Sequence, residues 1–209
     1  SGISTFRDAG GLWDKYPVEQ VATPEGYARN PELVINFYNE RRKQLLDVVP
    51  NAGHLGVADL ERDFNVTVVT QNVDNLHERA GSTHVIHLHG ELTKVCSSRD
   101  PYNPHFVKEL APEEYEVKLG DKAGDGTQLR PFIVWFGESV PEIETAIRYV
   151  EQADIFVIIG TSLNVYPAAG LLNYVPRAAE VYLIDPKPVD THVMRPIHVI
   201  QKGASEGVK

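Results

Sequence analysis

The sequence has a single cysteine, Cys96, among its 209 residues. One cysteine excludes an internal disulfide and, by itself, a zinc site built from cysteine ligands. A lone thiol is typical of a reduced compartment, so we expect a cytoplasmic protein. The chain also lacks any stretch of about 18 apolar residues, which excludes a membrane-spanning helix of the usual kind.

The chain lacks an excess of basic residues as well. Its 20 Lys and Arg against 29 Asp and Glu give a formal net charge of −9. Binding to nucleic acid needs a basic face, so we expect no nucleic-acid partner. The hydrophobic fraction of 42% is enough to bury one sizeable core with a small lobe attached.

Strand and helix patterns alternate through the second half of the chain. The strand patterns cover 66–70, 85–88, 132–136, 155–159 and 181–184, and the helix patterns cover 141–152 and 167–174. Residues 155–159 are all apolar, as expected for a strand covered on both faces. The alternation predicts an α/β fold with a Rossmann-like doubly wound parallel sheet.

A long helix is expected earlier, over 30–46. Asn30 suits the N-cap, Pro31 suits the first turn, and Glu32 complements the helix dipole. A second helix is expected after Asn51, and the two helices interrupt the alternation as if they formed a separate lobe. The stretch 93–130 has the least regular pattern of apolar residues, and we interpret it as a segment that leaves the main sheet.

Polar residues follow the first of these strands. Gln71, Asn72 and Asp74 lie where α/β proteins bind ligands, at the carboxyl end of a strand. An Asx turn, with Asp74 capping the next short helix, is an equally good interpretation.

Two histidines end the next strand. His87 and His89 are two residues apart and share a face. A metal pair, a structural histidine, and a general base near neutral pH are all compatible with this pattern.

Two glycine-containing turns are further candidates. Gly160, Thr161 and Ser162 close the most apolar strand, where they can meet a phosphate or ribose, although such turns also serve only to reverse the chain. The loop that contains Phe6 and Arg7 has glycines at 10 and 11 and can equally be an ordinary connector.

An arginine interrupts an apolar stripe on the helix over 30–46. Val34, Tyr38, Arg41 and Leu45 are spaced four, three and four residues apart. Arg41 can snorkel outward or pair with a local carboxylate. Alternatively, Tyr38 and Arg41 together face a bound carboxylate, which arginine meets with two parallel hydrogen bonds.

These pieces occur together in a recognisable order. Ser-Gly-Ile-Ser-Thr-Phe-Arg with Gly-Gly-Leu-Trp is followed by Thr-Gln-Asn-Val-Asp-Asn-Leu-His, His-Leu-His-Gly, Val-Trp-Phe-Gly-Glu and Gly-Thr-Ser-Leu-Asn-Val-Tyr-Pro. In this order they resemble the sirtuin family over essentially the whole chain.

The resemblance implies NAD as the cofactor and acyl-lysine proteins or peptides as partners. It implies one catalytic domain, with a large Rossmann-like part over about 1–15, 59–92 and 131–209 and a small lobe over about 16–58 and 93–130. His89 would be the catalytic base. The residues that would contact the cofactor are Phe6, Arg7, Gln71, Asn72, Asp74, Gly160, Thr161, Ser162, Asp185, Pro186, Lys187 and Ala204. Val134, Trp135, Phe136 and Gly137 would pair with the substrate backbone.

The implied reaction uses the acyl oxygen of the modified lysine. This oxygen attacks C1′ of the nicotinamide ribose, and His89 deprotonates the neighbouring hydroxyl. The products are lysine, nicotinamide and O-acyl-ADP-ribose. Tyr38 and Arg41 form a Tyr-x-x-Arg pattern similar to that of the branch that prefers succinyl, malonyl or glutaryl lysine, and Ala22 fits the wide acyl pocket of that branch.

Two departures from the family accompany the resemblance. The first strand and the Gly-rich loop of the family have no counterpart in the sequence. Cys96 is the only cysteine in the region where the family usually has four zinc ligands, so we expect no zinc. The alternatives are a plain lysine deacetylase, an ADP-ribosyl transferase, or a non-catalytic module that binds ADP-ribose or an acyl peptide.

Overall fold

The computed structural model describes residues 15–161, 163, 166–188 and 195–209. The chain divides into two compact units. Unit 1 contains the described residues up to 49 together with 72–75 and 89–139, and unit 2 contains those of 50–71, 76–88 and 140–209. The lobe boundaries implied by the family resemblance stay a prediction.

Among the described residues, the first helices of unit 1 are α2 (Val18–Val21), α3 (Pro24–Arg29) and α4 (Pro31–Leu46). The helix expected over 30–46 is confirmed, because the Asn30 side chain accepts a hydrogen bond from the Leu33 N–H and Pro31 occupies the first turn. One face of α4 carries the expected apolar stripe, in which Val34, Tyr38 and Leu45 are buried.

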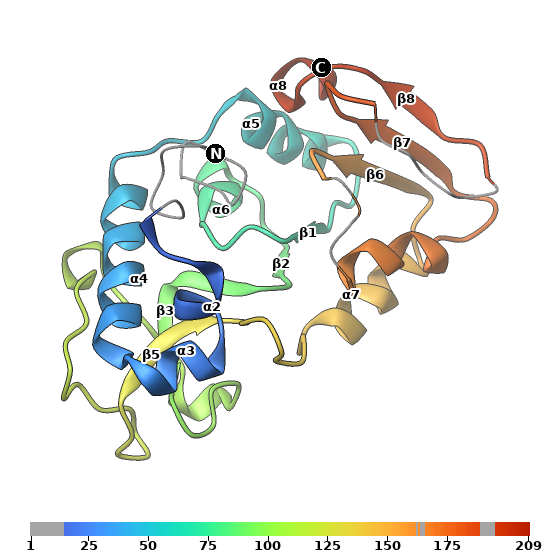
Figure 1. The fold of residues 1–209 in the computed structure, drawn as a ribbon. Coiled ribbons are helices and arrows are strands. Elements are labelled where there is room, and N and C mark those ends of the chain that lie inside the picture. Colours follow the sequence, from blue (N-terminus) through green and yellow to red (C-terminus); the bar gives the residue numbers. More distant parts are fainter. Residues whose placement is uncertain (1–14, 162, 164–165, 189–194) are drawn as a thin grey trace. The chain divides into compact units, whose positions relative to one another are not determined.

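The sheet of unit 1 is antiparallel. It contains β3 (Gly90–Ser97), β4 (Lys108–Glu109) and β5 (Leu129–Ile133) in the order β4-β3-β5. Two short 3-10 helices, η2 (Pro104–Phe106) and η3 (Pro112–Glu114), lie between its strands in sequence. Helix α4 packs against β3 and β5 (Figure 1). The expectation of a strand over 132–136 in the parallel sheet is wrong, because the strand ends at Ile133 and pairs with β3 instead.

Parallel strands build unit 2. One sheet joins β1 (Val68–Thr70) to β2 (Val85–His87), and the other has the order β6-β7-β8, with β6 (Ile155–Ile159), β7 (Glu180–Ile184) and β8 (His198–Ile200). The parallel pairing confirms the Rossmann-like α/β class expected from the alternation.

The helices of unit 2 are short. They are α5 (Ala52–Asp59), η1 (Leu60–Arg62), α6 (Leu76–Ala80), α7 (Ile143–Val150), η4 (Ala168–Tyr174) and α8 (Ala204–Gly207). Asn51 caps α5 by accepting from the Gly53 and His54 N–H groups. Helix α5 packs against α6 and α8, so it does not group with α4 as the sequence suggested. The helix expected over 167–174 is a 3-10 helix.

Each unit has its own apolar core. In unit 2, Ala146 and Val150 of α7, Leu171 and Leu172 of η4, and Ile158 of β6 pack together with further residues of the strands. In unit 1 the corresponding cluster is Ile35, Val95, Leu110 and Val117. In the part of the chain that the structure describes, every helix is too short or too polar to span a bilayer.

Candidate functional site

His89 lies in the turn between β2 and β3. Its carbonyl accepts from the Val134 N–H at 2.9 Å, and its residue is partly buried. The next residue must be glycine, because Gly90 has φ of 86° and a Cβ there would lie 2.1 Å from the Phe132 carbonyl oxygen. Both backbone contacts are with the end of β5, which therefore holds the backbone of His89 in unit 1.

Tyr38 and Trp135 meet in the interior of unit 1. The Trp135 Nε1–H donates to the Tyr38 hydroxyl at 3.1 Å, and the two residues are 2% and 1% exposed. Burial raises the pKa of Tyr38 to about 12, although the nearby Arg41 charge and the indole N–H oppose the shift. Tyr38 is thus a neutral hydroxyl at physiological pH.

Arg41 lies one turn further along α4 and is partly buried. Burial lowers its pKa, whereas Tyr38 and the carboxylate of Asp74 raise it. Asp74 is itself 4% exposed. The structure therefore brings together the predicted acyl-binding residues Tyr38 and Arg41 and the predicted nicotinamide-side residue Asp74, all within unit 1.

The neighbouring arginine has a different environment. Arg42 is 3% exposed, and its guanidinium donates to the carbonyls of Tyr115 at 2.7 Å and Leu92 at 3.4 Å and to the Asn39 Oδ1 at 2.6 Å. Burial lowers the pKa of Arg42 to about 10. Arg42 is a structural arginine that joins α4 to two distant segments, and the apolar spacing did not single it out.

The predicted substrate strand, 134–137, lies beside Ala22. The Phe136 N–H donates to the Ala22 carbonyl at 3.0 Å, and the Trp135 N–H donates to the Glu138 Oε1 at 2.8 Å. Together with the Val134 bond to His89, these contacts occupy three successive N–H groups, which a substrate backbone cannot use while they persist. Phe136 is 54% exposed, and no atom lies within 4 Å of a Cβ added at Gly137, so the surface of this segment is open at its end.

The predicted cofactor residues that the structure describes in unit 2 follow the carboxyl ends of parallel strands. Gln71 follows β1 and donates to the Thr161 hydroxyl, after β6, at 3.3 Å. Gly160 has φ of 63° and no atom within 4 Å of an added Cβ. This is the edge at which open α/β sheets bind ligands, so the arrangement fits a nucleotide.

The other predicted cofactor residues are less informative. Asp185 follows β7 and its Oδ1 accepts from the Lys187 N–H at 2.8 Å, an ordinary Asx turn in which Pro186 and Lys187 are exposed. Ala204 begins the four-residue helix α8. Asn72, in unit 1, is exposed. The predictions for Phe6, Arg7 and Ser162 lie outside the described residues.

Sequence reasoning missed a buried ion pair that contacts the predicted substrate segment, 134–137. Arg130 is 3% exposed and donates to both carboxylate oxygens of Glu138, at 3.0 Å each. The guanidinium carbon also lies 3.7 Å from the centre of the Trp135 ring. Glu138 is the last residue of the Val-Trp-Phe-Gly-Glu motif, but nothing in the neighbouring sequence indicated that Arg130 is its partner.

Two further polar residues, Glu78 and Asn75, were missed by the sequence analysis. The His87 Nε2 lies 2.8 Å from the Glu78 Oε2 in unit 2. In unit 1, the buried Oδ1 of Asn75 has no hydrogen-bond partner among the described residues. Asn75 directly follows the Asp74 candidate, so its oxygen is available to a ligand donor.

The region where the family usually binds zinc is held together by hydrogen bonds. The Ser97 hydroxyl donates to the Asp125 Oδ2 at 2.5 Å and lies 3.0 Å from the Thr127 hydroxyl. Cys96 is fully buried, and burial raises the pKa of its thiol to about 12. A thiol that resists ionisation is a poor zinc ligand, because zinc binds the thiolate.

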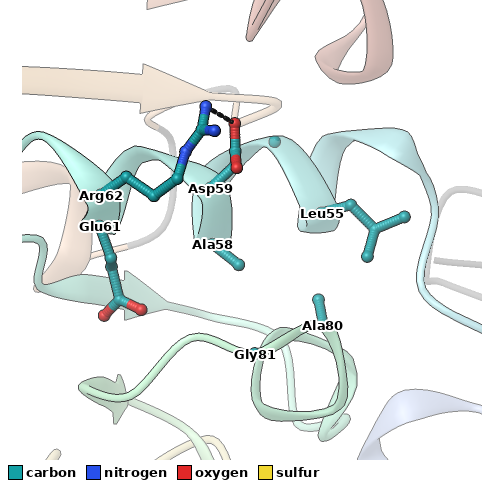
Figure 2. Close-up of a pocket in the computed structure, with 8 residues that line it drawn as sticks. Leu55, Ala58, Asp59, Glu61, Arg62, Ala80 and Gly81 are labelled. Atoms are coloured by element: carbon teal, nitrogen blue, oxygen red, sulfur yellow. Dashed lines mark hydrogen bonds and ion pairs between the residues drawn. The ribbon is translucent and has the colours of Figure 1, made fainter.

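A solvent-open depression of about 750 Å³ lies in unit 2 (Figure 2). Leu55, Ala58 and Ala80 contribute its apolar part, and Arg62 at its rim pairs with Asp59 at 2.8 Å. None of the predicted site residues lines it.

Comparisons with known proteins bear on this site. The model of the Sir2 family matches residues 1–167. An NAD-dependent protein deacylase of Bacteroides thetaiotaomicron is 85% identical over 209 residues, which are 100% of this chain and 89% of that protein. An NAD-dependent protein deacylase of Helicobacter pylori is 49% identical over 204 residues, covering 98% of this chain and 86% of its own.

Solved structures agree with the sequence matches. A Sir2 homologue in complex with ADP-ribose superposes with a TM-score of 0.85 at 37% identity, covering 100% of this chain and 83% of that chain. A Sir2 homologue in complex with NAD superposes with a TM-score of 0.83 at 37% identity, covering 100% and 81%. On the family match, the relatives and the shared fold, the chain belongs to the Sir2, or sirtuin, family.

Proposed function

We propose that this sirtuin is an NAD-dependent protein deacylase that prefers acidic acyl groups on lysine. Succinyl, malonyl and glutaryl groups would be removed faster than acetyl, giving nicotinamide and O-acyl-ADP-ribose. The coarser activity is the one in the names of the relatives, which are NAD-dependent protein deacylases. A solved Sir2 protein bound to a deacetylated peptide and an acetyl-ADP-ribose supports the same reaction.

One observation carries the acyl preference: Tyr38 and Arg41 are adjacent on the buried side of α4. Tyr38 offers a neutral hydroxyl in a desolvated setting, and Arg41 offers a guanidinium whose pKa is already lowered by burial. A guanidinium has five N–H donors, so Arg41 can interact with Asp74 and with a second carboxylate. An acidic acyl group supplies that carboxylate, and an acetyl group does not.

The residues of unit 2 support NAD binding. Gln71, Gly160 and Thr161 would contact the cofactor at the carboxyl end of the parallel strands, where Gly160 leaves open space. When bound, NAD supplies a ribose carbon that accepts the acyl oxygen. His89 would accept the proton of the adjacent ribose hydroxyl, a role for which an imidazole suits neutral pH.

We also propose that the small lobe needs no structural zinc. Ser97, Asp125 and Thr127 hold the region with hydrogen bonds, and the hydrogen bonds from Ser97 and Thr127 lower the pKa of Asp125 to about 2. The carboxylate is therefore ionised and keeps accepting from both hydroxyls at neutral pH. The buried Cys96 thiol supports the same proposal, because its pKa is raised.

Plain deacetylation is the second candidate, and a specific observation favours it. Asp74 already interacts with Arg41, so the protein itself supplies a counter-charge without an acidic substrate. If Asp74 satisfies Arg41 fully, the arginine is structural and acetyl-lysine is the natural substrate. The two candidates differ in the selectivity they predict.

The test is a panel of lysine peptides that share one sequence and carry acetyl, succinyl, malonyl or glutaryl groups. Turnover is followed with NAD by detecting free lysine peptide and O-acyl-ADP-ribose by mass spectrometry. A kcat/KM for succinyl at least about tenfold above that for acetyl is expected from one charge-assisted hydrogen bond. An equal or higher kcat/KM for acetyl refutes the acyl preference and favours plain deacetylation.

A further inference from the structure

The hydrogen bond between Trp135 and Tyr38 has a fixed direction. An indole nitrogen can only donate, so the Tyr38 oxygen, 3.1 Å away, must accept. The two side chains are 97 residues apart in sequence and almost fully buried. With its acceptor side occupied by the indole, the hydroxyl is left to donate its own proton elsewhere.

That proton has no acceptor among the residues that the structure describes. Among these residues, the hydrogen-bond partner of the Tyr38 oxygen is the Trp135 indole, for which it acts as the acceptor. A buried hydroxyl proton without an acceptor is unfavourable, so a ligand atom that accepts a hydrogen bond is stabilised there. A carboxylate oxygen meets that need, whereas the methyl group of an acetyl does not.

Several contacts hold the indole in this orientation. The Arg130 guanidinium lies 3.7 Å from the ring centre, and the Tyr27 ring packs against it with centroids 5.3 Å apart. Glu138 holds the backbone of the same residue by accepting from the Trp135 N–H at 2.8 Å, and it pairs with Arg130 through both carboxylate oxygens. Ring and backbone of Trp135 are thus tied to one buried ion pair.

We propose that Trp135 is a specificity-determining residue, because its indole N–H forces the Tyr38 hydroxyl to act as a donor toward an acidic acyl group. Arg130 and Glu138 are positioning residues that hold the indole. The inference rests on the proposed function and assigns a role to the side chain of Trp135.

The first experiment tests the hydrogen bond without substrate. The chain has two tryptophans, Trp13 and Trp135, so two indole N–H signals are expected in a ¹H–¹⁵N spectrum. The signal lost in Trp135→Phe identifies Trp135. Tyr38→Phe should move that signal upfield, because the indole loses its acceptor. An unchanged signal in folded Tyr38→Phe overturns the inference.

The second experiment is a double-mutant cycle on the succinyl to acetyl ratio of kcat/KM. Trp135→Phe should lower the ratio about 2- to 10-fold, the range expected for one net hydrogen bond, mainly by raising the KM for the succinyl peptide. Tyr38→Phe should lower it by at least as much. The double variant should be no lower than Tyr38→Phe alone, because Trp135 acts through that hydroxyl.

The outcomes separate this inference from the proposed function. A wild type without succinyl preference refutes the proposed function, and the inference falls with it. A wild type with that preference, unchanged in Trp135→Phe, refutes the inference alone. Additive losses in the double variant also refute it, since they show that Trp135 acts independently of Tyr38. Thermal unfolding of each variant confirms that the ratio is measured on folded protein.

Discussion

Among the described residues, the buried arginine and aspartate side chains of this sirtuin lie in unit 1, although both units also bury an apolar cluster. Unit 2 buries an apolar cluster beneath parallel strands, and its candidate cofactor-binding residues lie in short turns at the ends of strands. Unit 1 buries Arg42, Arg130, Tyr38 and Asp74, each beside a polar or charged partner. A buried polar group discriminates between ligands that do and do not complete its hydrogen bonds, so we expect acyl selectivity to reside in unit 1.

The two histidines of the His-Leu-His-Gly motif also lie in different units. His87 is buried in unit 2 and pairs with Glu78, while His89 is partly buried in unit 1. The first histidine is expected to act in stability and the second in catalysis, although they are two residues apart.

The largest expected effect is on turnover. His89→Ala should lower kcat about 100- to 10,000-fold, the usual range for the loss of a general base, while the midpoint of thermal unfolding changes little. The check is deacylation of the best acyl peptide together with a melting curve. Near-wild-type turnover by the folded variant would remove His89 from the proposed mechanism.

Asp74→Asn should act on catalysis more than on stability. Removing the charge weakens the nicotinamide side of the site and should slow nicotinamide exchange about tenfold or more, as for loss of one charge-assisted hydrogen bond. Exchange of labelled nicotinamide into NAD measures the effect, and urea unfolding measures the free energy of unfolding. Equal losses in both would favour the helix-capping interpretation of Asp74.

His87→Ala should have the opposite profile. It leaves the Glu78 carboxylate without its partner and should lower the free energy of unfolding by about 1–3 kcal/mol, with kcat largely retained. Urea titrations and steady-state kinetics on the same preparation decide the matter. If His87→Ala instead loses turnover at unchanged stability, the division of labour between the two histidines is wrong.

The same pair predicts a pH dependence of stability. The hydrogen bond and charge of His87 outweigh partial burial and lower the pKa of Glu78. A lowered carboxyl pKa stabilises the fold above the unfolded value of about 4.3 and loses that contribution as the pH falls through the folded pKa. The stability gap between wild type and Glu78→Gln should therefore be present at pH 7 and close below about pH 4; a gap that persists at low pH contradicts this origin.

The smallest effect expected is that of metal removal. Prolonged dialysis against a strong zinc chelator should leave both activity and melting temperature unchanged. Elemental analysis that finds one zinc per chain after dialysis would refute the zinc-free proposal. As a positive counterpart, Asp125→Ala should lower the melting temperature, because Ser97 and Thr127 lose their common acceptor.

Local patterns predicted the elements that depend on local chemistry. The Asn30 cap and Pro31 indicated the start of α4, and the apolar run of β6 has the bounds that the structure shows. The order of motifs indicated the family, which the comparisons confirm. Cytoplasmic location stays a prediction.

Long-range pairing could not be predicted. Nothing near Trp135 indicates that its side chain meets Tyr38, and nothing near Glu138 indicates Arg130, because these contacts depend on β5 pairing with β3 rather than with a parallel sheet. The β-branched pattern over 132–136 is compatible with either sheet. Likewise, Arg42 is more buried than Arg41, but the spacing of apolar residues along the helix placed only Arg41 on the apolar stripe.

The most direct test of acyl selectivity in unit 1 compares Arg41→Met with Arg42→Met, two neighbouring arginines on one helix. Arg41→Met should lower kcat/KM for the succinyl peptide by about 10- to 150-fold, mainly through KM, and spare or improve deacetylation. Arg42→Met should instead lower the free energy of unfolding and reduce both activities in parallel, because it leaves buried carbonyls without donors. Parallel loss of both activities in Arg41→Met would show that Arg41 is structural and would contradict the account.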